Sequence, residues 1–467
     1  MHRVSDNLEH RHPYNDPPFR ESANPKEVAR AFGNEAVPKY AKLLSMDDLS
    51  DEDRCRALQE LRELLSNQES KYTAVTNEVL FTCANLADSP DASVRANAAL
   101  TMATLVLCAP DKVDELSNDV MINAATKLAE DEEQEVAVGG CTIFRNLTIS
   151  NEGVELLAGK EEIVGKLAAK LTDQPLKFVP LPILELLLET LANLTRVYEG
   201  ARCAANYPIF SPVLAVLKKP VLYRAESILH ATLIVSNAAT HEQGKRAAIA
   251  IGAVELCLRV LTKNLDGKIS CGSSALRDEL TRSLVGAVMG LSTSEDAKPQ
   301  VVEFGVEPLA SCLTHASPAV KKNAMIAIRS ACESPGGATH FTRRLLGDTG
   351  LVVEVLGVKA IPALLACIAG DDEDERQQAI AVLLDLFRSE ASAEAAEQVT
   401  QTLGLLDALT ALLVDGSLES AQREQVVEIL GCMSQVSDGH RRRIAKRMEK
   451  VGVDAEIVAL VTEESAQ

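Results

Sequence analysis

The 467-residue chain contains no tryptophan, and aromatic residues make up only 3% of it, although 46% of its residues are hydrophobic. Its apolar side chains are therefore mostly those of leucine, alanine, valine and isoleucine, which suit close helix–helix packing better than a β-sandwich or barrel. The length exceeds one ordinary hydrophobic core, so we expect several domains or a repeat array.

Signals for export and membrane insertion are missing. The first twenty residues contain no apolar segment of the kind found in signal peptides, and no charge-free apolar run reaches the ~18–20 residues that cross a bilayer. The eleven cysteines are scattered from Cys55 to Cys432 without a C-x-x-C pair, which is typical of buried thiols in a reducing compartment. We therefore expect a cytoplasmic protein with no membrane partner.

Positive charge is also scarce. The chain has 47 Lys+Arg against 67 Asp+Glu, a formal net charge of −20. This charge balance excludes an overall basic surface for binding nucleic acid, and an anionic membrane would repel the chain. The basic surfaces of other proteins stay plausible partners.

Signatures of catalysis and of metal binding are absent too. The sequence has no G-x-S-x-G, no P-loop and no G-x-G-x-x-G that opens a helix. His10 and His12 form an H-x-H pair without further ligands. The acidic run GDDEDE at residues 370–375 lacks the fixed frame of an EF-hand, so we interpret it as helix capping. We expect no enzyme activity, metal, cofactor or small-molecule substrate.

What the sequence does contain is a repeated cassette. Residues 305–334, 357–389 and 403–435 each begin with a Gly or Leu and a short apolar helix of the form x-x-L-x-x-L. A turn follows, and then a longer helix in which Ala and Leu recur at three-to-four spacing. Most cassettes begin 42–53 residues apart, at or just beyond the ~40–47 residues of armadillo and HEAT repeats. One such helix pair cannot bury its apolar face alone, so the repeats must stack into a solenoid.

The prolines favour armadillo over HEAT repeats. Pro38, Pro308 and Pro362 each lie a few residues after a Gly, where the second helix of a repeat is expected to begin. This placement resembles the armadillo pattern G-x-(x)-x-P-x-L-x-x-L-L. We predict an all-α fold, a right-handed α-solenoid of about ten armadillo-type repeats over residues 23–460. Residues 1–22 and 461–467 are expected to be flexible tails. Residues 262–279 and 334–356 are expected to be insertions, the first of them a long polar loop.

A row of asparagines is in register with these repeats. Asn146, Asn193 and Asn237 close successive long helices at steps of 47 and 44 residues, the first two in Asn-Leu-Thr tripeptides. Those tripeptides match a glycosylation acceptor, but the chain lacks the export signal that glycosylation requires. An Asn amide can bind the backbone of an extended peptide, so the row is a candidate partner groove. The alternative is a polar residue that only ends a helix. Nuclear-import adaptors add a Trp four residues before each such Asn, so capture of a classical basic signal is not expected here.

The one strongly basic stretch is HRRRIAKRMEK at residues 440–450, which we expect to form a capping helix. Ile444 and Met448 are four residues apart and give this helix an apolar face. Its outer face is either simply solvated or docks on an acidic partner, such as a tubulin-type or coiled-coil surface. A nuclear localisation signal is a third interpretation, which the apolar pair weakens. The basic residues are Arg441, Arg442, Arg443, Lys446 and Arg447.

A further set of motifs lies in the N-terminal part of the chain. Asn24-Pro25 precedes a short helix, followed by Ala-Phe-Gly at residues 31–33 with Ala36 and Pro38. The runs LLSMDDLSDEDRCRAL at residues 43–58 and DSPDASVRANAALTMATL at residues 88–105 come next. Together these motifs resemble the radial spoke armadillo proteins of cilia and flagella, the radial spoke head fourteen homologue family.

The resemblance implies a non-catalytic scaffold subunit of the radial spoke, the axonemal arm that links doublet microtubules to the central apparatus. Its partners would be other spoke subunits and microtubule-associated axonemal proteins, and its location the cytoplasm and the ciliary axoneme. Two alternatives stay open. One is a cytosolic armadillo adaptor, unrelated to cilia, that grips an extended peptide. The other is a regulatory subunit or chaperone of an enzyme.

Overall fold

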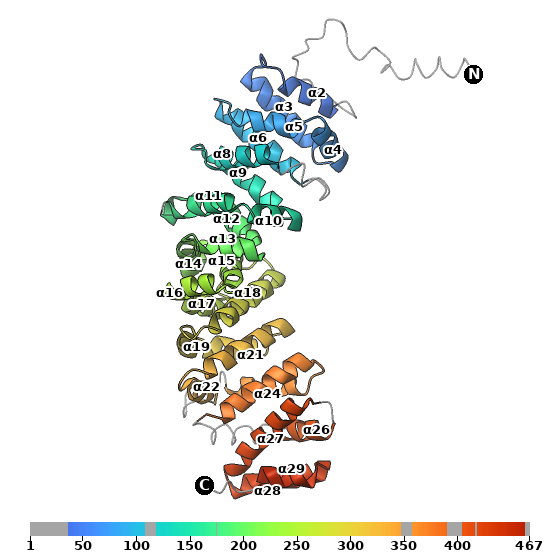
Figure 1. Cartoon of the computed structure of the whole chain (residues 1–467), viewed down its shortest axis with the longest axis vertical. Helices are drawn as coiled ribbons and strands as arrows, with labels where there is room; N and C mark the ends of the chain where they lie inside the picture. The colour runs from blue at the N-terminus through green and yellow to red at the C-terminus, as the bar shows by residue number, and fades with distance from the viewer. Residues whose placement is uncertain are drawn as a thin grey trace, which may run out of the picture. The chain divides into compact units, whose positions relative to one another are not determined.

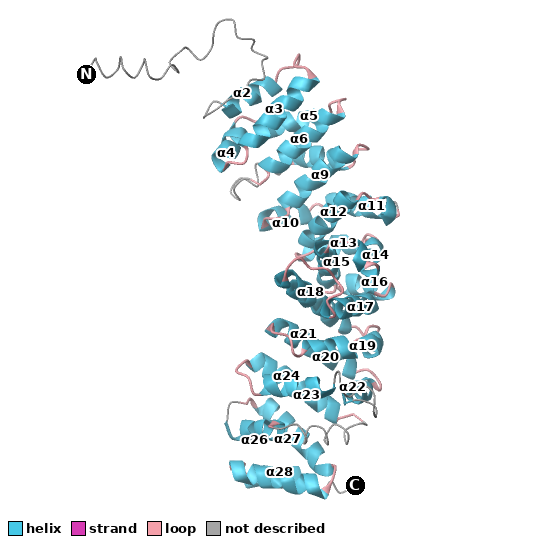
Figure 2. Ribbon diagram, turned by 180° about the vertical axis from the view of Figure 1, so that it is seen from behind, coloured by secondary structure: helices cyan, strands magenta, loops and turns pink. Residues whose placement is uncertain are grey.

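The structure is a computed structural model that describes residues 36–107, 118–173, 175–346, 357–389, 404–415 and 418–462. The predicted tail at residues 1–22 lies outside these ranges. The chain divides into two compact units, Met1–Leu156 and Leu157–Gln467. Within the described ranges all regular structure is helical and no strand occurs (Figure 1, Figure 2), as the sequence predicts.

In the described residues, the first unit contains one complete repeat, α4 to α6, and parts of two others. Its helices are α2 (Ala36–Leu44), α3 (Asp51–Leu64), α4 (Gln68–Thr76), α5 (Val79–Leu86), α6 (Ala92–Leu105), α8 (Asp119–Ala129) and α9 (Gln134–Leu147). The division between the units falls within α10 (Asn151–Ala158).

The second unit contains the remaining repeats. Its helices are α11 (Glu161–Thr172), η3 (Leu176–Phe178), α12 (Leu181–Leu194), α13 (Tyr198–Ala205), α14 (Phe210–Lys218), η4 (Pro220–Leu222), α15 (Ala225–Ala238), α16 (Glu242–Ala250), α17 (Ala253–Leu265), α18 (Ser274–Ser292), α19 (Lys298–Phe304), α20 (Val306–Cys312), α21 (Pro318–Cys332), α22 (Gly337–Leu346), α23 (Gly357–Ile368), α24 (Glu373–Phe387), α26 (Leu405–Asp415), α27 (Ser420–Gln435), α28 (Asp438–Val451) and α29 (Ala455–Thr462).

Each repeat ends in a long helix, and these long helices pack against one another in chain order within each unit. In the first unit they are α3, α6 and α9, and in the second α12, α15, α18, α21, α24 and α27. Two shorter helices precede each complete example, such as α13 and α14 before α15. This order of two short helices and one long helix is that of an armadillo-type α-solenoid, which confirms the predicted fold class.

The turns before the long helices are capped as the sequence predicts. Asp91 Oδ1 accepts a hydrogen bond of 3.0 Å from the Val94 amide at the start of α6. Asp372 Oδ1 accepts one of 2.9 Å from the Glu375 amide at the start of α24. The acidic run at residues 370–375 therefore satisfies amide groups that have no partner inside the helix.

The segment at residues 262–279 is mostly helical, which corrects the long loop that we predicted. α17 continues to Leu265, and α18 begins at Ser274, where Ser273 Oγ accepts a hydrogen bond of 3.1 Å from the Leu276 amide. Only residues 266–273 connect the two helices. The first turns of α18 bury little, so their residues lack the apolar period that indicates a helix in a sequence.

The segment at residues 334–356, which we predicted to be an insertion, contains the helix α22. Residues 347–356 of this segment lie outside the described ranges. At the C-terminus, α28 matches the predicted basic helix, but α29 follows it and includes Val461 and Thr462 of the predicted tail. The Val461 carbonyl is buried and accepts a hydrogen bond of 2.5 Å from Ser434 Oγ of α27, which fixes α29 on α27.

Candidate functional site

The three asparagines of the predicted row occupy equivalent positions, each the second-to-last residue of a long helix. Asn146 lies on α9, Asn193 on α12 and Asn237 on α15. Thr148 and Thr195, which end the two Asn-Leu-Thr tripeptides, are C-cap residues and are fully buried. The periodicity seen in the sequence is thus a property of the helix ends.

Two of these amides bind the repeat that precedes them. Asn146 Nδ2 donates a hydrogen bond of 2.7 Å to the Ala103 carbonyl in the last turn of α6. Asn237 Nδ2 lies 3.2 Å from the Ala192 carbonyl in the last turn of α12 and 3.1 Å from Thr195 Oγ1. The last carbonyls of a helix have no partner within it, so each Asn completes the hydrogen bonding of the helix before its own.

This arrangement favours the interpretation that these asparagines serve to end helices over the interpretation that they bind a peptide. Asn146 is only 7% exposed, and its Oδ1 accepts a hydrogen bond of 3.0 Å from Arg145 Nη1, so both ends of its amide have partners in the chain. Asn193 and Asn237 are half-buried. A peptide-binding role for Asn146, Asn193 and Asn237 stays a prediction.

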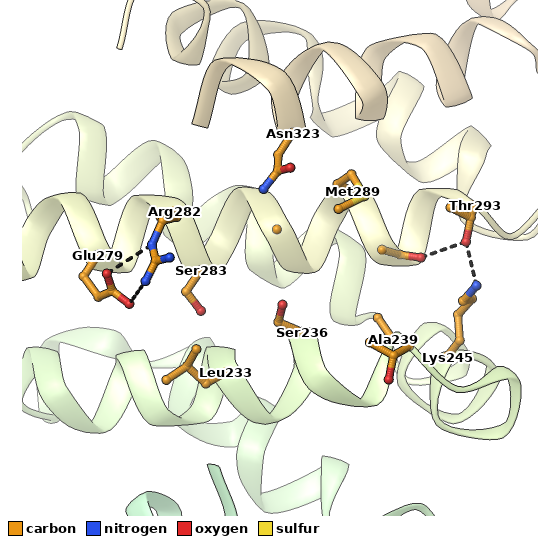
Figure 3. A pocket seen from close by; sticks show the side chains of 13 residues that line it. Leu233, Ser236, Ala239, Lys245, Glu279, Arg282, Ser283, Met289, Thr293 and Asn323 are labelled. Carbon is orange, nitrogen blue, oxygen red and sulfur yellow. Dashed lines mark hydrogen bonds and ion pairs between the residues drawn. The ribbon is translucent and has the colours of Figure 1, made fainter. Parts of the chain in front are cut away.

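A cavity of about 480 Å³ lies over α15 and α18 in the second unit, with α21 on its far side (Figure 3). It lies between successive long helices, where an armadillo solenoid has its groove. α15 contributes Leu233 and Ser236, α18 contributes Ser283 and Met289, and α21 contributes Asn323. This cavity, which we call the α18 hollow, is formed by residues other than those of the asparagine row.

Two glycines of α18 open the hollow. A Cβ at Gly286 would lie 3.6 Å from Ser236 Oγ and 3.7 Å from Asn323 Nδ2, which is ordinary contact, so the space beside Gly286 has room for another group. A Cβ at Gly290 would lie only 3.0 Å from Ala239 Cβ, so this glycine lets α18 approach the end of α15 closely. Glycine inside a helix costs about 0.5–1 kcal/mol relative to alanine, so α18 keeps this face open at the expense of its own stability.

Three polar side chains line the hollow: Ser236, Ser283 and Asn323. Ser283 Oγ has no hydrogen-bond partner among the described residues, whereas Ser236 and Asn323 are half-buried and open to solvent. Figure 3 shows Ser236 and Asn323 directed toward one another from α15 and α21, with α18 between them. Ser283 Oγ is buried, and buried polar groups without partners are rare in native structures. Two hydroxyls and one amide, which all donate and accept, therefore surround a space that is open to a ligand.

The two ends of the hollow carry charge. At one end Arg282 Nε donates to Glu279 Oε2 at 3.1 Å, and at the other Lys245 Nζ donates to Thr293 Oγ1 at 2.6 Å (Figure 3). The Lys245 ammonium is 4.0 Å from the Glu242 carboxylate, too far for a hydrogen bond. The hollow thus has a neutral polar centre between an ion pair and a lysine.

The basic helix α28 is amphipathic, as predicted. Arg441 Nη1 lies 3.3 Å from Asp438 Oδ1 of the same helix, and Arg447 Nε lies 2.6 Å from Asp407 Oδ1 of α26. Arg447 therefore also holds α28 to its neighbour, which our sequence interpretation did not foresee. The buried residues of the apolar face are Ile444 and Met448, and the exposed basic residues are Arg442, Arg443, Lys446 and Lys450.

Several cysteine thiols in the described part of the chain are deeply buried. Burial raises the pKa of the Cys83, Cys257 and Cys312 thiols to about 12, so these thiols stay protonated at neutral pH. Among the described residues no three His, Cys, Asp or Glu side chains lie close enough together to hold a metal ion. No helix in the described ranges combines the length and the apolar character that crossing a bilayer takes.

Sequence reasoning missed the α18 hollow entirely. Its one visible signal is the pair Gly286 and Gly290, four residues apart inside a helical pattern, because spaced glycines on one helix face indicate a close approach or an opening. Ser236, Ser283 and Asn323 come from three repeats, 47 and 40 residues apart, and their convergence depends on how the long helices stack.

Comparison with known proteins identifies the fold and leaves the family open. No family model matches the chain, and no curated protein matches it. The crystal structure of an engineered protein is 17% identical, with a TM-score of 0.65 over 91% of this chain and 97% of that chain. A chain from work on a phosphorylation switch that controls the interaction between cadherin and beta-catenin is 15% identical, with a TM-score of 0.66 over 91% of this chain and 84% of that chain. At these identities the likeness shows the armadillo-type fold alone.

Proposed function

We propose that this chain is a non-catalytic scaffold that holds an extended segment of a partner protein in the α18 hollow. The observation that carries the proposal is the set of polar groups around Gly286, contributed by Ser236, Ser283 and Asn323, of which Ser283 Oγ is buried without a partner among the described residues. A ligand in the hollow would give Ser283 Oγ a partner and would replace solvent at Ser236 and Asn323.

The chemistry of the hollow suits a peptide backbone. An extended chain presents amide N–H and carbonyl groups in alternation, and the Asn323 amide can pair with one of each. The hydroxyls of Ser236 on α15 and Ser283 on α18 add further donors and acceptors. Because Gly286 has no side chain, a bound backbone can approach α18 as closely as its helix atoms allow.

We also propose that this scaffold is a subunit of the axonemal radial spoke, where its partners are other spoke proteins. The support is the resemblance of residues 24–105 to the radial spoke armadillo proteins, together with a solenoid fold whose long surfaces suit protein partners. A cytosolic armadillo adaptor that grips an extended peptide is the second candidate, and the α18 hollow favours both equally.

Blocking the hollow tests the binding function. In the full-length protein, Gly286→Leu places a side chain in the space beside Ser236, where a Cβ meets only ordinary contacts. We expect circular dichroism and Tm to be maintained, and partner recovery in quantitative pull-downs from ciliated cells to fall at least tenfold. Gly431→Leu on α27 is the matched control, because Gly431 is helical and nothing lies within 4 Å of its Cβ position. Equal recovery with wild type and Gly286→Leu would refute the binding function.

Cell fractionation separates the two candidates. A spoke subunit should stay with axonemes after detergent removes the ciliary membrane, whereas a cytosolic adaptor should be extracted. A tagged chain found only in the detergent-soluble fraction of ciliated cells would exclude the radial spoke and leave the adaptor.

A further inference from the structure

Two short 3-10 turns of the second unit leave large apolar side chains in solvent. η3 precedes α12, and η4 precedes α15. Phe178 is 62% exposed, Val221 77% and Leu222 63%. Single exposed apolar residues are common, but exposed apolar side chains that gather in one place mark sites of interaction.

The two turns belong to adjacent repeats whose long helices touch. α12 and α15 pack against each other, and Arg224 Nη1 at the start of α15 lies 3.9 Å from Glu185 Oε2 in the first turns of α12. A cavity of about 480 Å³ opens between the η3 turn and α14, the helix that leads into η4. Its apolar lining includes three prolines: Pro175, Pro208 and Pro212. Leu176 of the η3 turn also lines this cavity, so the turn that carries Phe178 adjoins a space that a side chain of another protein can enter.

The rim of this surface is basic, although the chain as a whole has a net charge of −20. Lys177 Nζ lies 4.7 Å from the centroid of the Phe178 ring, a cation–π contact that keeps the ammonium beside the aromatic face. Lys218 and Lys219, at the end of α14, are both exposed. Asp173 is the exposed carboxylate in the lining of the cavity. Glu185 and Glu226, at the starts of α12 and α15, share Arg224 as their counter-charge. With the three lysines against Asp173, this edge keeps a small net positive charge.

We infer that this surface, the basic–apolar edge, docks a segment of another protein in which acidic residues flank a bulky apolar side chain. The edge is defined by Lys177, Phe178, Lys218, Lys219, Val221 and Leu222. The apolar side chain covers Phe178, Val221 and Leu222 and reaches the proline-lined cavity, and the acidic residues face the three lysines. Burying apolar area supplies most of the affinity, and charge complementarity selects the partner.

The basic–apolar edge is separate from the α18 hollow. It lies before the first residues of α12 and α15, whereas the hollow begins at Leu233, eight residues or about 12 Å further along α15. The two surfaces can therefore hold two segments at once. The edge does not depend on the proposed function of the hollow, and Gly286→Leu leaves every residue of the edge unchanged.

Selection from a displayed library of random twelve-residue peptides on the full-length chain tests the inference. We expect the enriched peptides to combine Asp or Glu with Leu, Ile, Phe or Trp. Lys218→Glu with Lys219→Glu should weaken the binding of these peptides at least tenfold, and so should Val221→Ser with Leu222→Ser. All four side chains are exposed, so these variants should fold.

Matched controls remove the general effect of charge. Arg246→Glu with Arg259→Glu makes the same change in net charge on exposed residues of α16 and α17, and it should leave peptide binding within twofold of wild type. For the apolar pair the control is Ile251→Ser, because Ile251 is also exposed. Peptides without acidic residues, or binding that both Lys218→Glu/Lys219→Glu and Val221→Ser/Leu222→Ser leave intact, would overturn the inference.

Two other occupants give different outcomes. If the edge instead binds lipid, phosphatidylserine vesicles will co-sediment with wild type and not with the Val221→Ser/Leu222→Ser variant. If it binds a second copy of the chain, analytical ultracentrifugation will show a dimer that this variant dissociates. Either result would overturn the docking of an acidic protein segment.

Discussion

The side-chain amide of Asn146 donates a hydrogen bond of 2.7 Å to the backbone carbonyl of Ala103, which lies 43 residues earlier on the preceding long helix. Asn237 makes the corresponding bond to Ala192, 45 residues earlier. Each bond joins a repeat to the one before it at a helix end, where the last carbonyls lack a backbone amide partner in their own helix. The Ala192 carbonyl also accepts a hydrogen bond of 3.1 Å from Thr195 Oγ1, the C-cap residue of α12. Asn146 and Asn237 thus connect successive repeats.

Replacing Asn146 should therefore destabilise the first unit. Asn146→Ala leaves the Ala103 carbonyl unsatisfied in a buried place, at a cost of about 1–3 kcal/mol in the free energy of unfolding. Urea unfolding of the full chain, followed by circular dichroism, measures the loss. Asn77→Ala is the control, because Asn77 is exposed and its Nδ2 donates to the Thr73 carbonyl of the helix that it ends, α4, and it should change stability by less than about 0.5 kcal/mol. Equal losses in the two variants would contradict the connecting role.

The two glycines of α18 should respond differently to alanine. Gly286→Ala gains helix propensity and meets only ordinary contacts, so it should raise the free energy of unfolding by up to about 1 kcal/mol. Gly290→Ala places its Cβ 3.0 Å from Ala239 Cβ, so the crowding should offset the gain and leave stability equal or lower. Differential scanning calorimetry of both variants checks the order. A larger gain at Gly290 than at Gly286 would show that the helices are not closely packed there.

Lys298 should depend on its two carboxylate partners. It is only 5% exposed, and its Nζ lies 2.6 Å from Glu295 Oε1 and 2.7 Å from Glu333 Oε2. Glu295→Gln with Glu333→Gln leaves a buried ammonium without a counter-charge, so this variant should unfold at lower urea than Lys298→Met, which keeps the apolar stem and removes the charge.

The pH dependence of this cluster has a definite sign. Hydrogen bonds to Glu295 and Glu333 raise the pKa of Lys298 above its ordinary value of 10.5. A raised pKa in the folded state means stability that is complete below 10.5 and is lost as pH rises through the raised value. Wild type should therefore lose more stability than Lys298→Met between pH 9 and pH 12, measured by urea unfolding at each pH. Parallel losses would show that the lysine makes no net contribution.

The buried thiols should be unreactive until the chain unfolds. With a pKa of about 12, Cys83, Cys257 and Cys312 hold little thiolate at pH 8, and they are also closed to reagents. Iodoacetamide labelling followed by mass spectrometry should leave them unmodified in the native protein and modify them in urea. Cys271, which is only half-buried, is the internal comparison and should react faster. Rapid native labelling of Cys257 would indicate local opening of α17.

The sequence predicts the fold from features that act locally. Apolar periodicity, acidic caps such as Asp91 and Asp372, and prolines such as Pro318 all act within a few residues, so a short window of the sequence is enough to recognise each of them. The first turns of α18 were misjudged because their exposed residues carry no apolar period. Ser273, the residue that caps α18, was the available signal.

The candidate site depends on contacts between repeats, which the sequence does not display. The register of Asn146 and Asn237 was visible, but their partners Ala103 and Ala192 are ordinary alanines that only helix stacking brings to them. Similarly, Ser236 and Asn323 line one hollow only because Gly286, which has no side chain, lies between them. Residues that share a site but belong to different repeats are paired by the stacking of the long helices, which no local pattern encodes.

The bond from Asn146 to Ala103 also makes the order in which the repeats are synthesised and docked matter. A ribosome makes α6 before α9, so the Ala103 carbonyl remains hydrated until the next repeat has been synthesised and has docked. Removing repeats from the C-terminal end leaves such carbonyls without their Asn, whereas removing them from the N-terminal end leaves an Asn amide that can turn to water. The end of α6 is therefore completed only when α9 has docked, and a nascent or truncated chain that stops before α9 leaves that end without its partner.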